Sequence, residues 1–73
     1  MGRIELKLDV MMAERRMSLN ELAERIGISN VNLSKIKNNK VTAVRFSTLA
    51  GICDALKCQP GDILKYVEEQ VVK

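Results

Sequence analysis

Residues 18–38, SLNELAERIGISNVNLSKIKN, contain two helix starts and one helix stop in close succession. Ser18 and Glu21 have the Ser-x-x-Glu spacing in which each side chain satisfies the backbone N–H of the other residue. Gly27 follows the apolar face of this first helix and is suited to the left-handed conformation that ends many helices. Ser29 can cap the next helix two residues later. The stretch therefore predicts two helices joined by a short link that contains glycine.

The brevity of this link constrains the angle between the two helices. A short glycine-containing link between amphipathic helices forces a steep crossing, which is the geometry of a helix-turn-helix. On the second helix, Leu33 and Ile36 are expected to point into the core. Asn39 is expected to be the left-handed residue that ends this helix, because asparagine is the best choice there after glycine. The positions left near the leading outer surface are Asn30, Val31, Asn32, Ser34 and Lys35.

The charge around the second helix has one sign. Five cationic side chains and no carboxylate lie between Arg25 and Cys53, although the net charge of the whole chain is only +3. These cations are Arg25, Lys35, Lys37, Lys40 and Arg45. Most charge runs are simply solvated faces of a protein. Here the cations accompany a turn and a polar, amide-rich helix, and that combination is typical of proteins that read DNA.

The two ends of the chain have strand-like patterns. Ile4, Leu6 and Leu8 alternate with charged residues, which predicts a short strand with one packed face. The apolar spacing then changes and predicts a helix over residues 9–16. Residues 65–72 fit either a strand or a helix continuation. A strand paired with the N-terminal strand is favoured, because it would give that exposed edge a partner.

Two further helices are expected after the helix-turn-helix. One begins near Arg45 or Phe46, because an apolar stripe with helical spacing follows it. A short final helix is expected at Pro60, where proline occupies a first helical position and Asp62 lies in the first turn. No internal repeat or linker interrupts the chain. The sequence thus predicts a mainly α, five-helix fold in one domain spanning residues 1–73, with a strand pair at its ends.

Composition excludes several classes of protein. No apolar run approaches the roughly 18 residues that span a bilayer, and the N-terminus lacks the apolar region of a signal peptide, so a soluble cytoplasmic protein without membrane partners is expected. The chain has no histidine, and Cys53 and Cys58 match no zinc spacing, so no metal is expected. With no glycine-rich phosphate loop and too little volume for an enclosed pocket, neither enzymatic activity nor a cofactor is expected.

Several separated segments resemble one known family. Residues 17–38, 45–49 and 52–64 are similar to the Cro/C1-type (Xre-like) helix-turn-helix repressors, in a small single-domain branch. The resemblance extends from about Leu8 to Tyr66. It implies a lambda-repressor-like DNA-binding domain that acts as a transcriptional regulator, which would block or recruit polymerase, with repression favoured. Its implied partners are double-stranded DNA, bound at an inverted-repeat operator through the helix over residues 30–38, and a second copy of the chain in a homodimer.

The resemblance also implies roles for individual residues. The family's base-reading positions fall on Asn30, Val31, Asn32 and Lys35. Asparagine can pair with adenine, lysine with guanine, and an aliphatic side chain with the methyl group of thymine. The residues expected to hold phosphates without reading sequence are Ser29, Ser34, Asn38, Lys40, Arg45, Ser47 and Thr48. Val31 can equally be an isolated exposed apolar residue, which needs no functional explanation.

The sequence departs from the family pattern at two positions. Many members place a glutamine at the start of the first motif helix, where it braces a phosphate and the reading helix, whereas Leu19 stands here. The usual Asn-Gly after the reading helix is Asn38-Asn39, a milder change because asparagine tolerates the same backbone conformation. The first departure predicts that the glutamine brace is absent.

Two other functions fit the same fold. Small domains of this type also resemble antitoxins, which neutralise a toxin-like protein by contact and bind their own promoter secondarily. In that case Val71-Val72 or an apolar strand edge would be the binding surface. The domain could also be an adaptor whose basic face binds an acidic protein. A neighbouring toxin-like reading frame would favour the antitoxin, and binding that DNA does not compete would favour the adaptor.

Overall fold

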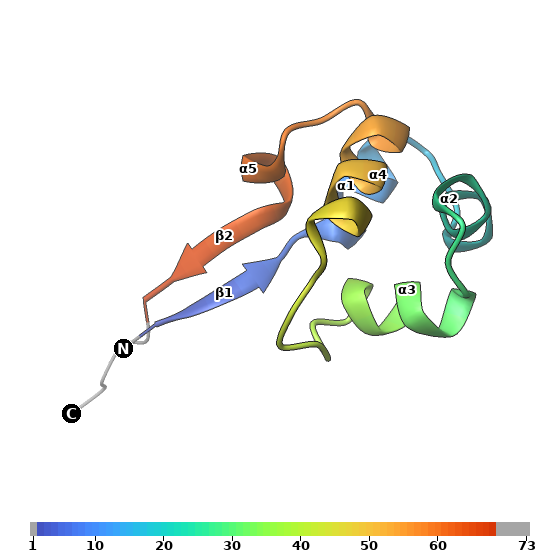
Figure 1. The fold of residues 1–73 in the computed structure, drawn as a ribbon. Coiled ribbons are helices and arrows are strands. Elements are labelled where there is room, and N and C mark those ends of the chain that lie inside the picture. The colour runs from blue at the N-terminus through green and yellow to red at the C-terminus, as the bar shows by residue number, and fades with distance from the viewer. Residues whose placement is uncertain (1, 69–73) are drawn as a thin grey trace.

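The computed structural model describes residues 2–68, which form five α-helices and a two-stranded antiparallel sheet (Figure 1). In chain order the elements are β1 (Arg3–Leu6), α1 (Leu8–Glu14), α2 (Leu19–Ile26), α3 (Asn30–Lys37), α4 (Phe46–Leu56), α5 (Pro60–Ile63) and β2 (Leu64–Val67). The helices pack together at one end of the molecule, and the two strands project from them as a ribbon. The mainly helical fold with five helices and a terminal strand pair is confirmed.

The strand pair differs in its bounds from the sequence-based expectation. Its register places Ile4 opposite Tyr66 and Leu6 opposite Leu64. The favoured strand after α5 is confirmed for Leu64–Val67, and the rest of the predicted stretch beyond residue 68 lies outside the described residues. β1 ends at Leu6, although the backbone N–H of Lys7 still donates to the carbonyl of Ile63, the residue opposite it in the same register, at 2.6 Å before α1 begins at Leu8. Leu8 was expected on the strand but begins α1.

α1 ends at Glu14, two residues before the expected end near Arg16. Arg16 has a φ of 53°, in the left-handed region that stops a helix. The N–H of Met17 reaches back to the carbonyl of Met12 at 3.0 Å. A left-handed residue followed by this long backward bond is how many helices close their last turn. The apolar residues with helical spacing end at Met12, so they could not fix where among the following charged residues the helix stops.

The two starts and the stop of the helix-turn-helix follow the predicted chemistry. The Ser18 hydroxyl accepts from the N–H of Glu21 at 3.1 Å, and Ser29 accepts from the N–H of Asn32 at 3.1 Å. Gly27 has a φ of 74°, as expected for the residue that ends α2. The expected reciprocal cap differs, because the Glu21 carboxylate accepts from Arg25 at 3.2 Å.

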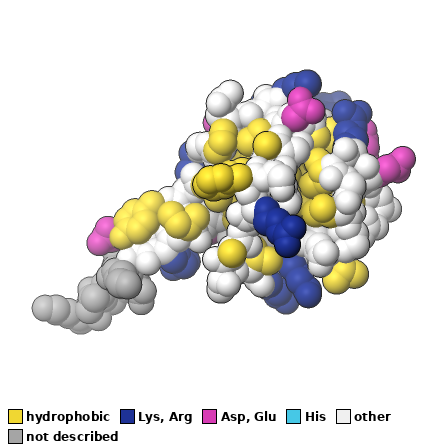
Figure 2. Space-filling view, in the orientation of Figure 1, with side chains coloured by type: hydrophobic (Ala, Val, Ile, Leu, Met, Phe, Trp, Pro, Cys, Tyr) yellow, Lys and Arg dark blue, Asp and Glu magenta, His cyan; other side chains and the backbone are white. Residues whose placement is uncertain are grey.

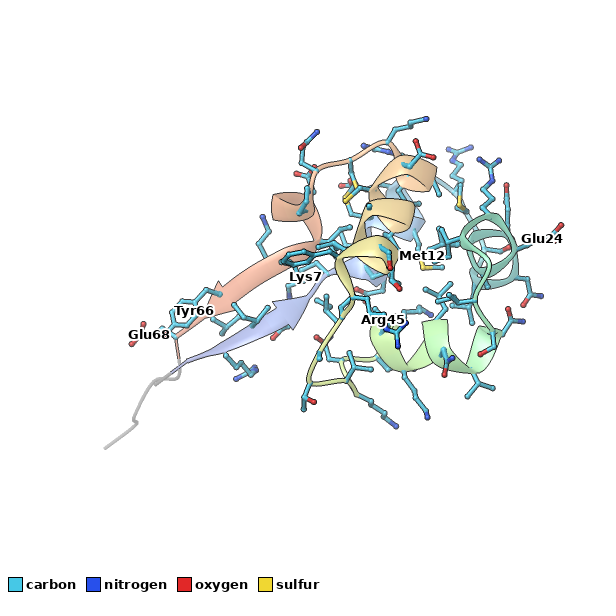
Figure 3. The ribbon with its side chains drawn as sticks, in the orientation of Figure 1. Lys7, Met12, Glu24, Arg45, Tyr66 and Glu68 are labelled. Carbon is cyan, nitrogen blue, oxygen red and sulfur yellow. The ribbon has the colours of Figure 1, made fainter. Side chains whose placement is uncertain are left out.

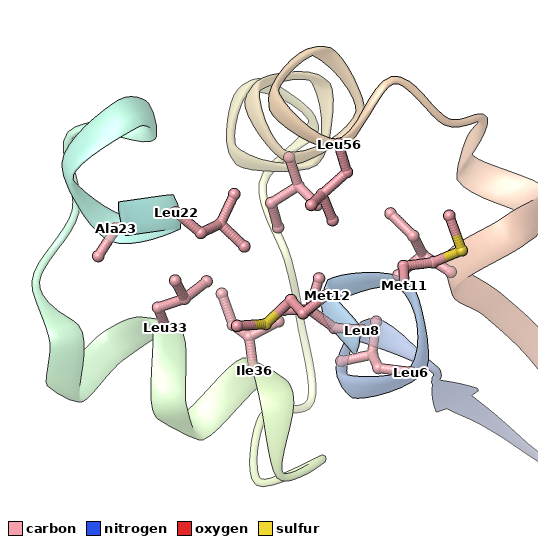
Figure 4. Packing of buried hydrophobic residues seen from close by; sticks show 11 residues of the cluster. Leu6, Leu8, Met11, Met12, Leu22, Ala23, Leu33, Ile36 and Leu56 are labelled. Atoms are coloured by element: carbon pink, nitrogen blue, oxygen red, sulfur yellow. The ribbon is translucent and has the colours of Figure 1, made fainter. Parts of the chain in front are cut away.

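One apolar cluster joins all five helices to β1 (Figure 4). Leu33 and Ile36 are buried as predicted, and they hold α3 against the rest of the cluster. Cys53 packs against this cluster and is only partly covered. The buried members are Leu6, Leu8, Met11, Met12, Leu22, Ala23, Leu33, Ile36, Ile52, Leu56 and Ile63. One side of α3 is therefore buried in the core, and its other side is exposed to solvent.

Candidate nucleic-acid interface

The outer side of α3 is exposed. Leu33 is fully buried on the inner side, whereas Val31 is 65% exposed on the outer side. Asn30, Asn32 and Lys35 are also exposed. All four residues predicted to read bases therefore lie on solvent-accessible positions of one helix, at the edge of the molecule away from the β1/β2 ribbon (Figure 1).

Two hollows flank α3, and Lys35 borders both. Each has a volume of about 450 Å³. The first is lined by Leu19, Asn30, Val31, Ser34, Lys35, Asn38 and Lys40. The second is lined by Ile28, Asn32, Lys35, Ile36, Val41, Ala43, Val44, Arg45 and Thr48. The structure thus brings nine of the eleven predicted residues around one helix and the start of the next.

The remaining two predicted residues lie at helix starts. Ser29 caps α3, so its hydroxyl already accepts a backbone hydrogen bond. Ser47 is exposed in the first turn of α4 and borders neither hollow. Arg45 precedes α4 as its N-cap and makes no side-chain cap, and Figure 3 shows its side chain between α4 and α3. The first backbone N–H groups of α4 are therefore not satisfied by a capping side chain.

The cations around α3 are largely free of carboxylates. Within residues 2–68, Lys35, Lys37, Lys40 and Arg45 form no ion pair. Arg25, which the sequence placed in the same positive run, pairs with Glu21 at 3.2 Å on α2. The positive surface therefore centres on α3 and on the segment that leads into α4. Such a surface attracts polyanions over a distance set by ionic strength.

The structure contains an amide contact between α2 and α3 that the sequence did not predict. The Asn30 side-chain amide donates to the Asn20 side-chain oxygen. Leu19, at the position of the family's glutamine, instead lines the hollow beside Asn30 and Val31. The contact from α2 to the predicted reading surface therefore comes from Asn20, one residue after the position of the family's glutamine. The sequence feature that could have predicted this contact is the pair of asparagines in the first turns of two successive helices.

Cys53 and Cys58 are free cysteines, and both are partly buried. Burial raises the pKa of the Cys58 thiol, and the neighbouring Cys53 raises it further. No group of three His, Cys, Asp or Glu side chains within residues 2–68 is placed to hold a metal ion. In the same part of the chain, no helix has the length and apolarity to cross a membrane.

Comparison with known proteins agrees with this geometry. Residues 7–69 match the profile of the Cro/C1-type HTH DNA-binding domain. Over 67 residues the chain is 55% identical to YozG, an uncharacterized HTH-type transcriptional regulator of Bacillus subtilis (strain 168), and the match covers 92% of this chain and 80% of YozG.

Solved structures of regulators have the same fold. The transcriptional regulator VanUg superposes with a TM-score of 0.73 at 32% identity, over 93% of this chain and 89% of VanUg. SinR, a master regulator for biofilm formation solved in complex with DNA, superposes with a TM-score of 0.69 at 28% identity, over 74% of this chain and 86% of that one. The chain belongs to the Cro/C1-type helix-turn-helix DNA-binding family of non-enzymatic transcriptional regulators.

Proposed function

We propose that this regulator is a repressor that binds an inverted-repeat operator as a homodimer, with α3 of each copy in the major groove. The observation that carries the proposal is the exposed row of amide, aliphatic and cationic side chains on α3, held outward by the burial of Leu33 and Ile36. An α-helix fits the major groove, and two half-sites one turn apart lie about 34 Å from centre to centre. Bound there, the dimer blocks access of polymerase.

Base recognition is assigned to Asn30, Val31, Asn32 and Lys35. An asparagine amide can accept from N6 and donate to N7 of adenine. A lysine can donate to O6 and N7 of guanine, and a valine can contact the methyl group of thymine. The operator half-site therefore contains A·T pairs and at least one G·C pair.

Asn20 supports this role for Asn30. The Asn30 amide nitrogen carries two N–H donors, and one of them is engaged by Asn20. The second N–H and the side-chain oxygen remain for a bidentate contact with a base. Because the Asn20 bond fixes the rotation of the amide, Asn30 loses less side-chain entropy when it binds.

Phosphate binding is assigned to residues on both sides of α3. The uncapped start of α4 offers backbone N–H groups beside the Arg45 guanidinium, a combination that suits an anion. Contacts of this kind set the register of the protein on the duplex without reading sequence. The proposed residues are Ser29, Ser34, Asn38, Lys40, Arg45, Ser47 and Thr48.

Selection of bound sequences from a random duplex pool tests the proposal. We expect enrichment of an inverted repeat whose half-site centres are one helical turn apart. A Lys35→Ala variant should enrich the same architecture with relaxed preference at one position of each half-site. Failure to enrich any sequence would contradict specific DNA binding, and enrichment of an asymmetric site would contradict the homodimer.

A further inference from the structure

The β1/β2 ribbon has one apolar face that runs beyond the core. Side chains alternate along a strand, so Ile4 and Leu6 share a face with their partners Tyr66 and Leu64. Leu6 is 7% exposed, whereas Ile4 and Tyr66 are 62% and 60% exposed. Figure 3 shows Tyr66 on the part of the ribbon that projects from the helices. An isolated pair of strands is only marginally stable in water, so this face is expected to have a covering partner.

A cleft and a protruding aromatic ring lie next to this face. The cleft has a volume of about 710 Å³. Phe46, at the first position of α4, is 88% exposed at its edge. Figure 2 shows hydrophobic side chains on the ribbon and again on the adjoining part of the helical body. The apolar lining comes from Ile4, Leu6, Val41, Val44, Leu49 and Leu64.

We propose that this surface binds a second copy of the chain across a two-fold axis, with Phe46 of each copy inserted into the cleft of the other. The inference rests on the homodimer of the proposed function and assigns its interface. A two-fold interface requires one surface to be complementary to itself. A protruding ring and an apolar cleft on the same surface meet that requirement, because each copy offers both.

The charges on the cleft rim are also self-complementary. Arg3 and Glu5 are its charged lining residues, and they lie two positions apart on β1 at 3.2 Å. Lys7 lowers the pKa of Glu5, with a smaller contribution from Arg3, which further favours the charged carboxylate. When the free edges of two copies of β1 run side by side in opposite directions about Ile4, Arg3 of one lies near Glu5 of the other. A partner surface carrying charges of one sign only would attract either Arg3 or Glu5 and repel the other.

The dimensions favour copies that overlap along the ribbon. The molecule is 45 Å long, and the ribbon occupies the end opposite α2 and α3 (Figure 1). Two copies that touched only at the ribbon tips would place their α3 helices much farther apart than the roughly 34 Å between successive half-sites. Packing through Phe46 and the cleft, close to the helical body, shortens that separation.

Sedimentation equilibrium of the full chain tests the assigned surface. We expect a dimer for the unmodified chain, and a rise of about 30-fold or more in the dimer dissociation constant for Phe46→Glu, as for a central aromatic anchor. Phe46 is almost fully exposed, and an acid suits the first turn of a helix, so the variant should fold. Val10→Glu is the matched control, since Val10 is 48% exposed but does not line the cleft.

Charge exchange distinguishes a second copy from any other partner. Arg3→Glu alone should bring two carboxylates together across the axis, and Glu5→Arg alone should bring two guanidinium groups together, so both variants should dimerise more weakly. An equimolar mixture of the two variants should recover the dimer as a heterodimer, because each pairing across the axis then joins opposite charges. Native mass spectrometry resolves the heterodimer from the two homodimers.

Binding to a duplex with one half-site separates this inference from DNA binding itself. Phe46→Ala, which truncates the ring without placing a negative charge between Arg45 and Ser47, should bind that duplex with unchanged affinity and lose only the cooperative binding to the inverted repeat. A monomeric unmodified chain at 100 µM (roughly the weak limit of functional dimers) would overturn the inference, as would an unweakened Phe46→Glu dimer. Binding of Phe46→Ala that weakens equally on both duplexes would also overturn it, since the effect would then lie in the DNA interface.

Discussion

Asn39 hydrogen-bonds through its side chain to both backbone groups of Leu6. Its amide nitrogen donates to the Leu6 carbonyl at 3.0 Å, and its amide oxygen accepts from the Leu6 N–H at 2.6 Å. The side chain thus acts toward β1 as a neighbouring strand would. Asn39 also has a φ of 60°, in the left-handed region, just beyond the end of α3. One residue therefore ends α3 and ties that end to β1.

Replacing Asn39 should separate these two roles. Asn39→Gly keeps the left-handed backbone but removes both hydrogen bonds, which should lower the free energy of unfolding by about 1–3 kcal/mol. Asn39→Ala adds a backbone penalty of about 1 kcal/mol, because alanine disfavours this conformation. Urea denaturation measures both values. Equal stability of the glycine variant and the unmodified chain would show that the amide bonds contribute nothing.

The contact between Asn20 and Asn30 should act on DNA recognition. Asn20→Ala should leave the free energy of unfolding within about 0.5 kcal/mol, as for an exposed helix position. It should weaken operator binding by about 1 kcal/mol, the value of one hydrogen bond. In the double variant with Asn30→Ala, the two losses should not add, because both remove the same contact. Full additivity, measured by fluorescence anisotropy, would show that Asn20 acts independently of Asn30.

Lys40 should contribute to affinity without contributing to specificity. If it neutralises one phosphate, Lys40→Ala should weaken binding to operator and random DNA alike, and should reduce the slope of log K against log salt by about 0.9. Lys65→Ala removes the same charge from the ribbon, outside both hollows around α3, and is the matched control. An unchanged slope for Lys40→Ala would place Lys40 off the DNA.

The Ser18 cap should be a purely structural contact. Ser18→Ala leaves the Glu21 N–H without its side-chain acceptor and should reduce the free energy of unfolding by about 1 kcal/mol. Because Ser18 lies outside the residues assigned to DNA, operator affinity of the folded variant should not change. Ser18→Asp, which preserves a capping oxygen, should restore most of the stability in the same denaturation assay.

Cys58 should react slowly with alkylating reagents. Its raised pKa leaves less thiolate in the folded chain at a given pH than in a free cysteine, and the thiolate is the reactive form. In a Cys53→Ala variant the contribution of Cys53 is lost but burial still raises the pKa of Cys58, so iodoacetamide labelling should require a higher pH than in the same chain unfolded by urea. Between the ordinary thiol pKa and the raised pKa of Cys58 the unfolded state ionises first, so the free energy of unfolding should fall as pH rises through that interval. A labelling midpoint at or below that of free cysteine would contradict this.

Local chemistry made most of the fold predictable. Ser18, Ser29 and Pro60 are helix starts with side-chain or ring geometry that specifies the position, and Gly27 is a stop that needs a positive φ. Each feature acts within four residues, so the sequence alone reveals it. The bounds of α1 depended instead on Arg16, a residue with no intrinsic preference for the left-handed backbone, and on a backward bond from Met17.

The parts of the candidate interface that were not predicted depend on distant residues. The Asn20–Asn30 contact depends on the crossing of two helices, and the Asn39–Leu6 bonds join positions 33 residues apart. A sequence pattern indicates which positions are buried and how they are spaced, but it does not indicate which polar side chains will meet. The cleft beside Phe46 likewise forms from β1, the segment after α3, and α4. Its existence follows only from the assembled fold.

The ratio of operator affinity to random-DNA affinity tests the central role of α3 most directly. The selected operator and a scrambled duplex should be titrated at one salt concentration with the unmodified chain and with Asn32→Ala. We predict that Asn32→Ala lowers operator binding by about 1–3 kcal/mol, relaxes the preference at one base pair of each half-site, and leaves random-DNA binding unchanged. Equal losses on both duplexes would contradict base reading by the exposed side of α3.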